Sequence, residues 1–295
     1  MTSQALHEIH LPGLKPWRQG KVRTVYEANG SLVMVASDRL SAYDCVLPTP
    51  IPGKGEELTR LSVFWFQQLK SATPHHFISD DPLRYPPPFD LHAPRLSGRS
   101  MLVRRAERID IECVVRGYLT GSGWKEYTQS GAVCGIKLPA GLHDGSRLDP
   151  PIFTPATKEE SGHDQNISFE ETVKRIGKPL AEQLRERSMA IYREAHDWAW
   201  ARGLVLADTK FEFGHVDGVL TLIDEVLSPD SSRYWDRAAY EKGKLHSFDK
   251  QYVRDYLDRS GWNHEPPAPE LPPEVVAATV ERYREALTRL TGDAR

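Results

Sequence analysis

Hydrophobic patterns along the first third of the chain predict a small antiparallel sheet with one helix. Two β-rich runs, Lys21–Glu27 and Ser31–Ser37, flank Ala28-Asn29-Gly30, and an Asn-Gly pair at that place predicts a tight hairpin. Leucine and aromatic residues at helical spacing predict a helix over Glu56–Ala72. Further strands are expected over Met101–Arg105 and Ile109–Leu119.

The rest of the chain alternates helices with strands that favour antiparallel pairing. The stretch from Thr120 to Asn166 is rich in Gly, Pro and Ser and has little periodicity, so we expect a long functional loop. Ser168-Phe169-Glu170-Glu171 is a capping box that opens a helix ended by Gly177. The other expected elements are helices over Pro179–Arg202, Asp249–Arg259 and Glu274–Leu290, and strands over Leu204–Asp208, Lys210–Val216 and Val219–Val226. This order predicts an α+β fold and argues against a Rossmann domain.

Composition narrows the class of protein without indicating its chemistry. The 295 residues carry 38 Lys plus Arg and 41 Asp plus Glu, a formal net charge of −3, which argues against a bulk nucleic-acid binder. No apolar run approaches the ~18 residues of a membrane helix, and the N-terminus lacks a signal-peptide pattern. Cys45, Cys113 and Cys134 form no CxxC pair, which suits reduced thiols. We therefore expect a cytoplasmic protein that binds neither nucleic acid nor membrane.

Several cations stand beside small polar residues in arrangements that suit phosphate. Gly20 precedes Lys21 and Arg23, and side chains two apart on a strand share one face, so both could neutralise phosphates. An exposed cationic strand edge is the alternative. Arginine with hydroxyl and backbone amide donors recurs at Arg116-Gly117-Tyr118…Gly121-Ser122-Gly123, Asp208-Thr209-Lys210 and Ser231-Ser232-Arg233, where a purely structural role is again the alternative.

Two carboxylates, Glu212 and Asp224, lie in strongly apolar strands on either side of Asp217-Gly218. If that pair turns a hairpin, position 212 lies opposite 223 or 224, depending on whether the loop has two residues or three. The three-residue loop would place the carboxylates side by side, where they would repel unless a cation joined them. Mg²⁺ completed by nucleotide phosphates satisfies that need, whereas lysine or arginine partners on a solvated face are the alternative.

Two loops add polar side chains, and no nucleophile stands out. Ser37–Asp44 follows an apolar strand, and Ser161-Gly162-His163-Asp164 lies in the long middle stretch. There is no GxSxG motif, and Cys45 has no local histidine partner. The residues favour chemistry on phosphates, Mg²⁺ and anionic ligands without a covalent protein intermediate.

These motifs together resemble one enzyme family. The shared segments are Gly20-Lys21-Val22-Arg23, Ser37-Asp38-Arg39-Leu40-Ser41-Ala42-Tyr43-Asp44, Arg116-Gly117-Tyr118…Gly121-Ser122-Gly123, Leu206–Gly214 and Ile223–Arg233. In this order, from about residue 13 to 258, they resemble the phosphoribosylaminoimidazole-succinocarboxamide synthases, or SAICAR synthetases, of purine biosynthesis. The stretch Ala132–Gln165 resembles the extended form of the family.

The resemblance implies an ATP-dependent ligase and a fold to match. L-Aspartate would be joined to the carboxylate of carboxyaminoimidazole ribonucleotide (CAIR) through an acyl phosphate, giving SAICAR, ADP and phosphate. The family fold implies a small β-rich nucleotide-binding domain over 1–110 and a larger α/β substrate and Mg²⁺ domain over 111–295, with a nucleotide cleft between them. ATP, CAIR and L-aspartate would be the partners of a monomer or small homo-oligomer.

The resemblance also implies a role for individual residues. ATP would lie against Gly20, Lys21, Val22, Arg23, Val103 and Lys250, and Mg²⁺ against Glu212 and Asp224. CAIR would contact Arg116, Ser122, Asp208, Lys210 and Arg233, and aspartate Ser37, Arg39, Ser41, His163 and Asp164. Asp38, Asp44 and Lys210 are the catalytic candidates. The alternatives are another ATP-dependent ligase, a small-molecule kinase, and a nucleotide-sensing or RNA-binding module.

Overall fold

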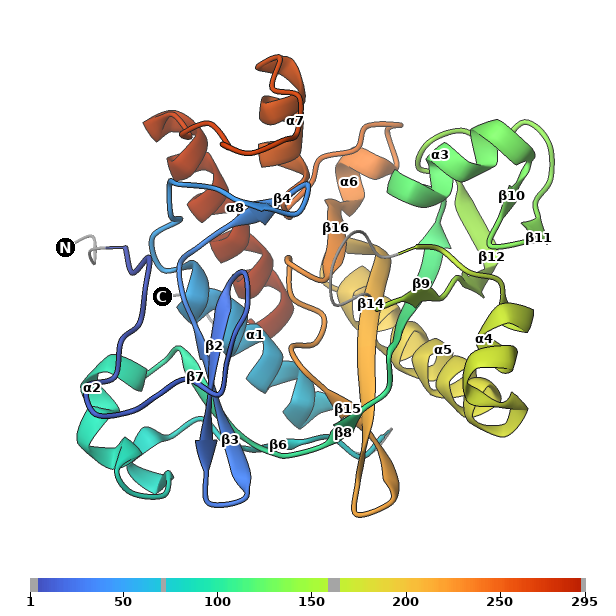
Figure 1. Ribbon diagram of the computed structural model, residues 1–295. Helices are drawn as coiled ribbons and strands as arrows, with labels where there is room; N and C mark the ends of the chain where they lie inside the picture. The colour runs from blue at the N-terminus through green and yellow to red at the C-terminus, as the bar shows by residue number, and fades with distance from the viewer. Residues whose placement is uncertain (1–4, 70–72, 159–164, 293–295) are drawn as a thin grey trace.

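Two antiparallel sheets frame the computed structural model, which describes residues 5–69, 73–158 and 165–292 (Figure 1). The first sheet contains, in spatial order, β1 (Arg18–Gln19), β2 (Arg23–Ala28), β3 (Ser31–Ala36), β7 (Ser100–Arg104) and β6 (Phe77–Ser79). The second contains β12 (Arg147–Phe153), β9 (Ile111–Tyr118), β14 (Leu204–Val216) and β15 (Val219–Ile223), with β13 (Ala156–Thr157) beside β9, and β16 (Ser232–Asp236) and β8 (Glu107–Arg108) beside β14. Two small hairpins are β4–β5 (Ser41–Ala42, Cys45–Val46) and β10–β11 (Ala132–Val133, Ile136–Lys137). The predicted α+β class with antiparallel sheets is confirmed.

Helices cover the sheets and fill the space beside them. They are α1 (Lys54–Gln68), α2 (Ala93–Leu96), α3 (Gly121–Ser130), α4 (Phe169–Ile176), α5 (Lys178–Trp200), α6 (Arg237–Tyr240), α7 (Gln251–Arg259) and α8 (Pro273–Thr291), with 3₁₀ turns at Pro82–Arg84 and Phe89–His92. Helix α1 packs on β3 and β7, α5 packs on β14 and β9, and α8 lies against α1. No helix in the described ranges is long and apolar enough to cross a membrane.

Local turn chemistry explains both predicted hairpins. Asn29 and Gly30 have φ values of 47° and 81°, and Asp217 and Gly218 have values of 51° and 76°. Positive φ at both central residues is the type I′ turn that matches the twist of paired strands. The second turn therefore contains two residues and pairs Val216 with Val219.

Two predictions along the chain are corrected by the structure. The stretch from Thr120 to Asn166 is not one loop, because it contains α3 and four short strands. Gly121 and Gly123 in the first turn of α3 lower its helix propensity and hide it in the sequence. The two strands predicted on either side of Thr209 are one continuous strand, β14, which takes up a register shift against β16.

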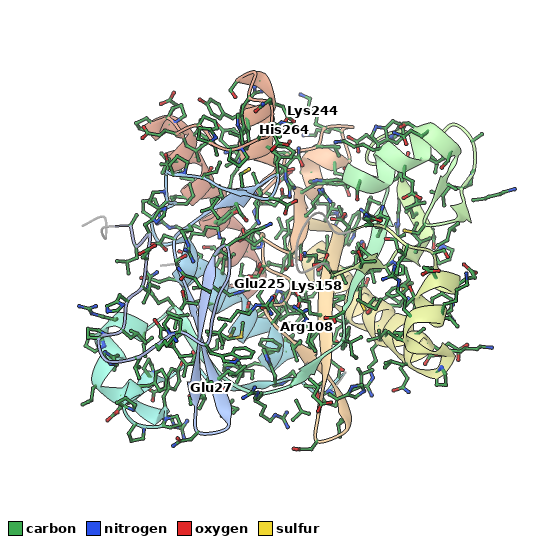
Figure 2. The ribbon with its side chains drawn as sticks, in the orientation of Figure 1. Glu27, Arg108, Lys158, Glu225, Lys244 and His264 are labelled. Carbon is green, nitrogen blue, oxygen red and sulfur yellow. The ribbon has the colours of Figure 1, made fainter. Side chains whose placement is uncertain are left out.

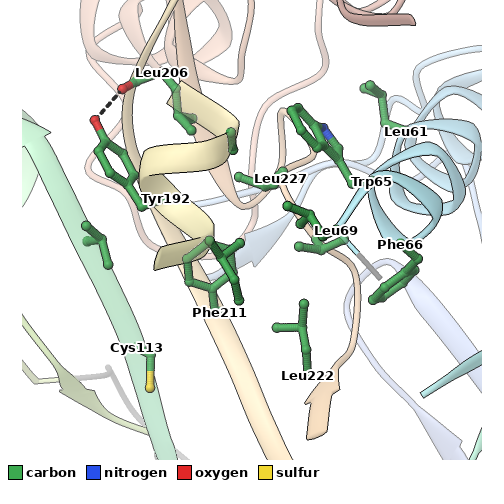
Figure 3. Packing of buried hydrophobic residues seen from close by; sticks show 14 of the residues in the cluster. Leu61, Trp65, Phe66, Leu69, Cys113, Tyr192, Leu206, Phe211, Leu222 and Leu227 are labelled. Carbon is green, nitrogen blue, oxygen red and sulfur yellow. Dashed lines mark hydrogen bonds between the residues drawn. The ribbon is translucent and has the colours of Figure 1, made fainter. Parts of the chain in front are cut away.

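One continuous hydrophobic core lies between the two sheets. Leu61, Trp65 and Phe66 of α1, with Leu69 at its C-terminal end, face Phe211 of β14 and the residues that follow β15 (Figure 3). The hydroxyl of Tyr192 on α5 donates to the carbonyl of Leu206 (2.7 Å), which ties the helix to the strand beneath it. The core therefore fixes β14 in the middle of the molecule.

A buried ionic cluster around Asp230 joins the C-terminal helices to this frame. Asp230 is 3% exposed and contacts Lys54 Nζ (2.6 Å) at the start of α1 and Lys250 Nζ (3.5 Å) before α7. The Tyr283 hydroxyl of α8 donates to its other oxygen (3.1 Å). Burial opposes ionisation, but Lys250 and Lys54 outweigh it and lower the pKa of Asp230 far below its usual range. Residues far apart in the sequence thus depend on one carboxylate.

We expect Asp230→Asn to lower the free energy of unfolding by about 3–5 kcal/mol at neutral pH, because two buried ammonium groups lose their counter-ion. A carboxyl whose pKa is depressed in the folded state contributes stability above its unfolded pKa of about 4, and this contribution is lost as the pH falls. The difference in unfolding free energy between wild type and Asp230→Asn should therefore shrink in acid. Urea denaturation at several pH values measures it. Asp110→Asn, which removes an exposed partner of Arg108 (2.7 Å), is the control and should cost less than about 1 kcal/mol. Equal losses in the two variants would contradict the assigned role of Asp230.

Candidate active site

The turn Gly20–Val22 joins β1 to β2 at one end of the first sheet. The N–H of Gly20 donates to the carbonyl of Arg23 (2.8 Å) and closes the turn. Lys21 is at the tip, half exposed, and forms an ion pair with Asp44 of the β4–β5 turn. Because β2 begins only at Arg23, strand periodicity does not place Lys21 and Arg23 on one face, and the two cations bind different carboxylates.

Arg23 connects the first sheet to the end of β15. Its guanidinium bonds Asp224 Oδ2 (2.7 Å) and Glu225 Oε2 (3.0 Å). Burial disfavours the charge, but Asp224, Glu225 and Glu212 outweigh burial and raise the pKa of Arg23. Figure 2 places Glu225 and Lys158 in the middle of the molecule, between β2 and β14. The turn that carries Lys21 is therefore tied directly to a group of acids.

Glu212 of β14 lies in a second set of ion pairs. It pairs with Lys158, which also contacts Glu112 Oε1 of β9 (3.3 Å), and Lys210 Nζ contacts the same Glu112 oxygen (2.6 Å). Burial would raise the pKa of Glu212, but Lys158, Lys210 and Arg23 outweigh it and lower that pKa. Glu212 is therefore ionised at neutral pH although its side chain is only 13% exposed.

Asp224 is close enough to Glu212 for their charges to interact, although the two are not paired across the hairpin. The two-residue turn pairs Glu212 with Ile223, so the three-residue alternative is not found. Burial raises the pKa of Asp224 to about 6; Arg23 opposes this, and the nearby Glu212 and Glu225 add to it. In the described part of the chain no three His, Cys, Asp or Glu side chains are grouped to hold a metal ion. The carboxylates fit Mg²⁺ only as a partial site that nucleotide phosphates would complete.

A second charged group surrounds Asp208, two residues before Lys210. Asp208 pairs across the sheet with Arg116 of β9 on one side and Arg233 of β16 on the other. Its Oδ2 accepts from Arg116 Nη1 (2.8 Å) and Arg233 Nη1 (2.5 Å). Arg116 also donates to the hydroxyls of Thr154 (3.0 Å) and Ser122 (2.9 Å). One carboxylate thus holds two guanidinium groups together and leaves a net positive charge.

The start of α3 lies against these guanidinium groups. Gly121 has φ of 57°, and a Cβ added there would overlap the guanidinium of Arg233. Thr120, which precedes the helix, makes no side-chain cap bond to the first amides. Arg233 Nε is buried with no hydrogen-bond partner among the described residues. Two arginines, a hydroxyl and uncapped helix amides are the donor set of a phosphate-binding site.

Asp208, Lys210 and Glu212 occupy alternate positions of β14 and so share one of its faces. Two residues of a strand span about 6.8 Å, so the anion-binding group and the acidic group stand roughly 14 Å apart. A phosphorylated ligand and a nucleotide–metal complex bound to the two groups would therefore meet above Lys210. This geometry suits transfer between two anionic substrates.

Comparisons with known proteins show the family of this chain. The sequence model of the SAICAR synthetase family matches residues 16–269. The chain belongs to the SAICAR synthetase family. A phosphoribosylaminoimidazole-succinocarboxamide synthase of Desulfosudis oleivorans is 55% identical over 291 residues, 98% of this chain and 99% of that protein. The enzyme of the same name from Trichlorobacter lovleyi is 51% identical over 292 residues, 98% of this chain and 99% of its own.

Solved SAICAR synthetases have the same fold over nearly their full length. SAICAR synthase from Saccharomyces cerevisiae, complexed with SAICAR, aligns with a TM-score of 0.88 at 38% identity and covers 99% of both chains. A type-2 SAICAR synthetase in complex with ADP aligns with a TM-score of 0.71 at 25% identity, over 94% of this chain and 98% of that chain. The protein is an ATP-dependent ligase that joins CAIR and aspartate in purine biosynthesis, as the resemblance implied.

Two residues expected at the SAICAR synthetase site have fully buried side chains. Asp38 is fully buried and accepts from the backbone N–H groups of Leu6 (2.8 Å) and Gly55 (2.9 Å) and from Arg99 (3.2 Å), which leaves it no access to substrate. Val103 is also fully buried, between β3 and β6. The narrow cavity behind Arg23 is lined instead by Met101 of the same strand, with Val22, Met34 and Glu225 among its other residues.

The remaining expected contacts divide into three groups. Lys250 belongs to the Asp230 cluster, where burial lowers its pKa to about 8 against the attraction of Asp230. Ser37 and Arg39 bond the Gly20–Val22 turn, and Ser41 is half-buried at the start of β4. His163 and Asp164 lie outside the described residues.

The structure adds site residues that sequence reasoning missed. Glu112, Lys158, Glu225 and Thr154 all contact residues of the two charged groups. Glu112 stands between apolar neighbours on a predicted strand, as Glu212 does, and that pattern could have identified it. Lys158 had no such signal, because its partners lie 46 and 54 residues away.

We expect Gly121→Ala to raise the KM for the ribonucleotide about tenfold or more, because the new Cβ displaces Arg233 and weakens a charged hydrogen bond to the ligand. Gly131→Ala is the matched control at the other end of α3. It has the same left-handed backbone (φ 68°) but nothing within 4 Å of the added Cβ, so it should lower stability by about 1 kcal/mol and leave that KM unchanged. Steady-state kinetics measures both, and equal KM values in the two variants would contradict the assignment.

Proposed function

We propose how the described residues divide the SAICAR synthetase reaction among themselves. The single observation that carries the proposal is the alternation of Asp208, Lys210 and Glu212 along one face of β14. The ribonucleotide phosphate binds at Arg116, Ser122 and Arg233, and Asp208 holds the two guanidinium groups in place. Lys210 lies between this group and the acids, where it can neutralise the CAIR carboxylate.

ATP occupies the other end of the same face. Its phosphates lie against the Gly20–Val22 turn and exchange the ion pair of Lys21 with Asp44 for one with phosphate. Glu212 and Asp224 would hold Mg²⁺ together with oxygens of the ATP phosphates. When bound, Mg²⁺ neutralises negative charge that develops on the transferring phosphoryl group.

The chemistry follows from the poor reactivity of a carboxylate as an acyl donor. The CAIR carboxylate oxygen attacks the terminal phosphorus of ATP, and ADP leaves with the electrons of the broken P–O bond. The aspartate amine then attacks the acyl phosphate, phosphate leaves, and the amine loses a proton as the amide forms. Such transfer depends on positioning and on charge neutralisation, which fits a site built of ion pairs without a nucleophile.

Glu212→Gln and Asp224→Asn should each reduce kcat by at least about 10²-fold, because an amide is a weaker ligand for Mg²⁺ than a carboxylate. Both variants should fold, since Lys158 and Arg23 each keep a second acidic partner, Glu112 and Glu225. Asp217→Asn at the tip of the same hairpin is the control, because asparagine accepts its positive φ of 51°. Phosphate release as a function of Mg²⁺ concentration measures the effect. A normal kcat with an unchanged Mg²⁺ requirement in both variants would refute this site.

Omission of one substrate tests the proposed acyl-phosphate route. With ATP and CAIR present, phosphate release should depend on L-aspartate, and the product should contain the new amide. Stoichiometric ADP formation that ignores aspartate and yields a stable phosphorylated product would contradict that route.

A further inference from the structure

The loop that follows β3 supports the Gly20–Val22 turn from behind. Ser37 donates to the carbonyl of Val22 from its backbone N–H (3.0 Å) and from its hydroxyl (2.8 Å). Arg39 donates from Nη2 to the carbonyl of Gly20 (3.1 Å) and from Nε to the Ser37 hydroxyl (3.1 Å). Both flanking carbonyls of the turn are therefore bound by this one loop.

Burial keeps these two side chains away from substrate. Ser37 is 2% exposed and Arg39 is 7% exposed, and their hydrogen bonds use the Ser37 hydroxyl and two nitrogens of the Arg39 fork. Lys21 and Val22, by contrast, donate no backbone N–H to another backbone group within the described part of the chain. Because Ser37 and Arg39 bind the carbonyls of the turn from one side, the backbone amides of Lys21 and Val22 remain able to bind an anion on the other side.

The positive charge of Arg39 also favours an anion at the turn. Its hydrogen-bond partners are a carbonyl and a hydroxyl rather than a carboxylate, and burial lowers its pKa against the weaker attraction of Glu8. A guanidinium nevertheless stays protonated at any physiological pH. Its positive charge therefore lies directly behind the turn, and no carboxylate of the described residues forms an ion pair with it.

Asp38, between the two, ties the loop to α1. Its Oδ1 accepts from the N–H of Gly55 in the first turn of that helix, and its Oδ2 accepts from the N–H of Leu6. The Ser37-Asp38-Arg39 segment thus fixes the turn relative to a helix in the main core. Such support is what keeps a phosphate-binding turn at its working geometry.

We propose that Ser37 and Arg39 are positioning residues for the ATP-phosphate turn and do not contact L-aspartate. This inference rests on the proposed placement of ATP phosphates at Gly20–Val22, and it replaces the aspartate-binding role expected for both residues. In the sequence, Ser37 and Arg39 stand out only as part of a polar motif after an apolar strand. In the structure, both side chains donate to backbone carbonyls of the preceding turn.

The test is the pattern of KM values in Arg39→Met, Arg39→Lys and Ser37→Ala. Loss of a charged hydrogen bond should raise the KM for ATP roughly tenfold or more in Arg39→Met and less in Ser37→Ala, whose lost bond is neutral. Arg39→Lys keeps the charge but not the fork, so its KM for ATP should lie between wild type and Arg39→Met. The KM values for CAIR and aspartate should stay within about twofold of wild type.

Calorimetric titration with ADP alone gives a second readout that needs no turnover. Arg39→Met should weaken ADP binding by the same factor as it raises the KM for ATP. Arg95→Met is the matched control, because exposed Arg95 also donates to a backbone carbonyl, that of His10 (2.8 Å), but on α2. Its KM values and its ADP affinity should equal those of the wild type.

Three results would overturn the inference. A raised KM for aspartate with an unchanged KM for ATP would make Arg39 a substrate contact, and unchanged values for all substrates would remove its role. A uniform loss of activity and stability with normal ADP affinity would make it structural only. If Arg39→Met does not fold, Arg39→Lys and Ser37→Ala give the same comparison. Failure of the proposed function is separate, because it would appear as a normal kcat and an unchanged Mg²⁺ requirement in Glu212→Gln and Asp224→Asn.

Discussion

Opposite charges from different strands stabilise one another on a single face of β14, and the site depends on that pairing. Asp208 lies between Arg116 and Arg233, Lys210 contacts Glu112, and Glu212 contacts Lys158. The side chains of Arg116, Asp208 and Glu212 are 4%, 6% and 13% exposed, and an unpaired ion at that depth would cost several kcal/mol. The strands that supply the partners therefore assemble the site as they fold around β14.

The near-neutral total charge conceals a local separation of positive and negative groups. The −3 of the whole chain averages a positive group near Asp208 with an acidic group of Glu112, Glu212, Asp224 and Glu225. The positive group suits a ribonucleotide phosphate, and the acids suit a metal ion held by a nucleotide. The two groups lie close enough, about 14 Å apart along the strand, for their ligands to react with each other.

Sequence reasoning succeeded where the chemistry is local. The Asn29-Gly30 and Asp217-Gly218 turns, the Ser168 cap and the polar residues of β14 each depend on neighbours a few positions away. It failed where the partner is distant or the signal is hidden. The Asp230–Lys54 pair spans 176 residues, and the glycines that lie against Arg233 and Arg116, Gly121 and Gly123, also disguise α3 as a loop.

The same limit explains the reinterpretation of the motif after β3. Hydroxyl, carboxylate and guanidinium groups together predict a ligand site, but only the fold shows that Ser37 and Arg39 bind a neighbouring turn. These two polar side chains thus act on the protein's own backbone.

The central claim is that the CAIR carboxylate and the terminal phosphate of ATP meet above β14 and react directly. CAIR labelled with ¹⁸O in its carboxylate, followed by mass spectrometry of the released phosphate, tests this claim most directly. Direct attack predicts one ¹⁸O atom in each phosphate, because the carboxylate oxygen leaves with phosphorus when the amide forms. Unlabelled phosphate from a turnover that yields SAICAR would contradict the account.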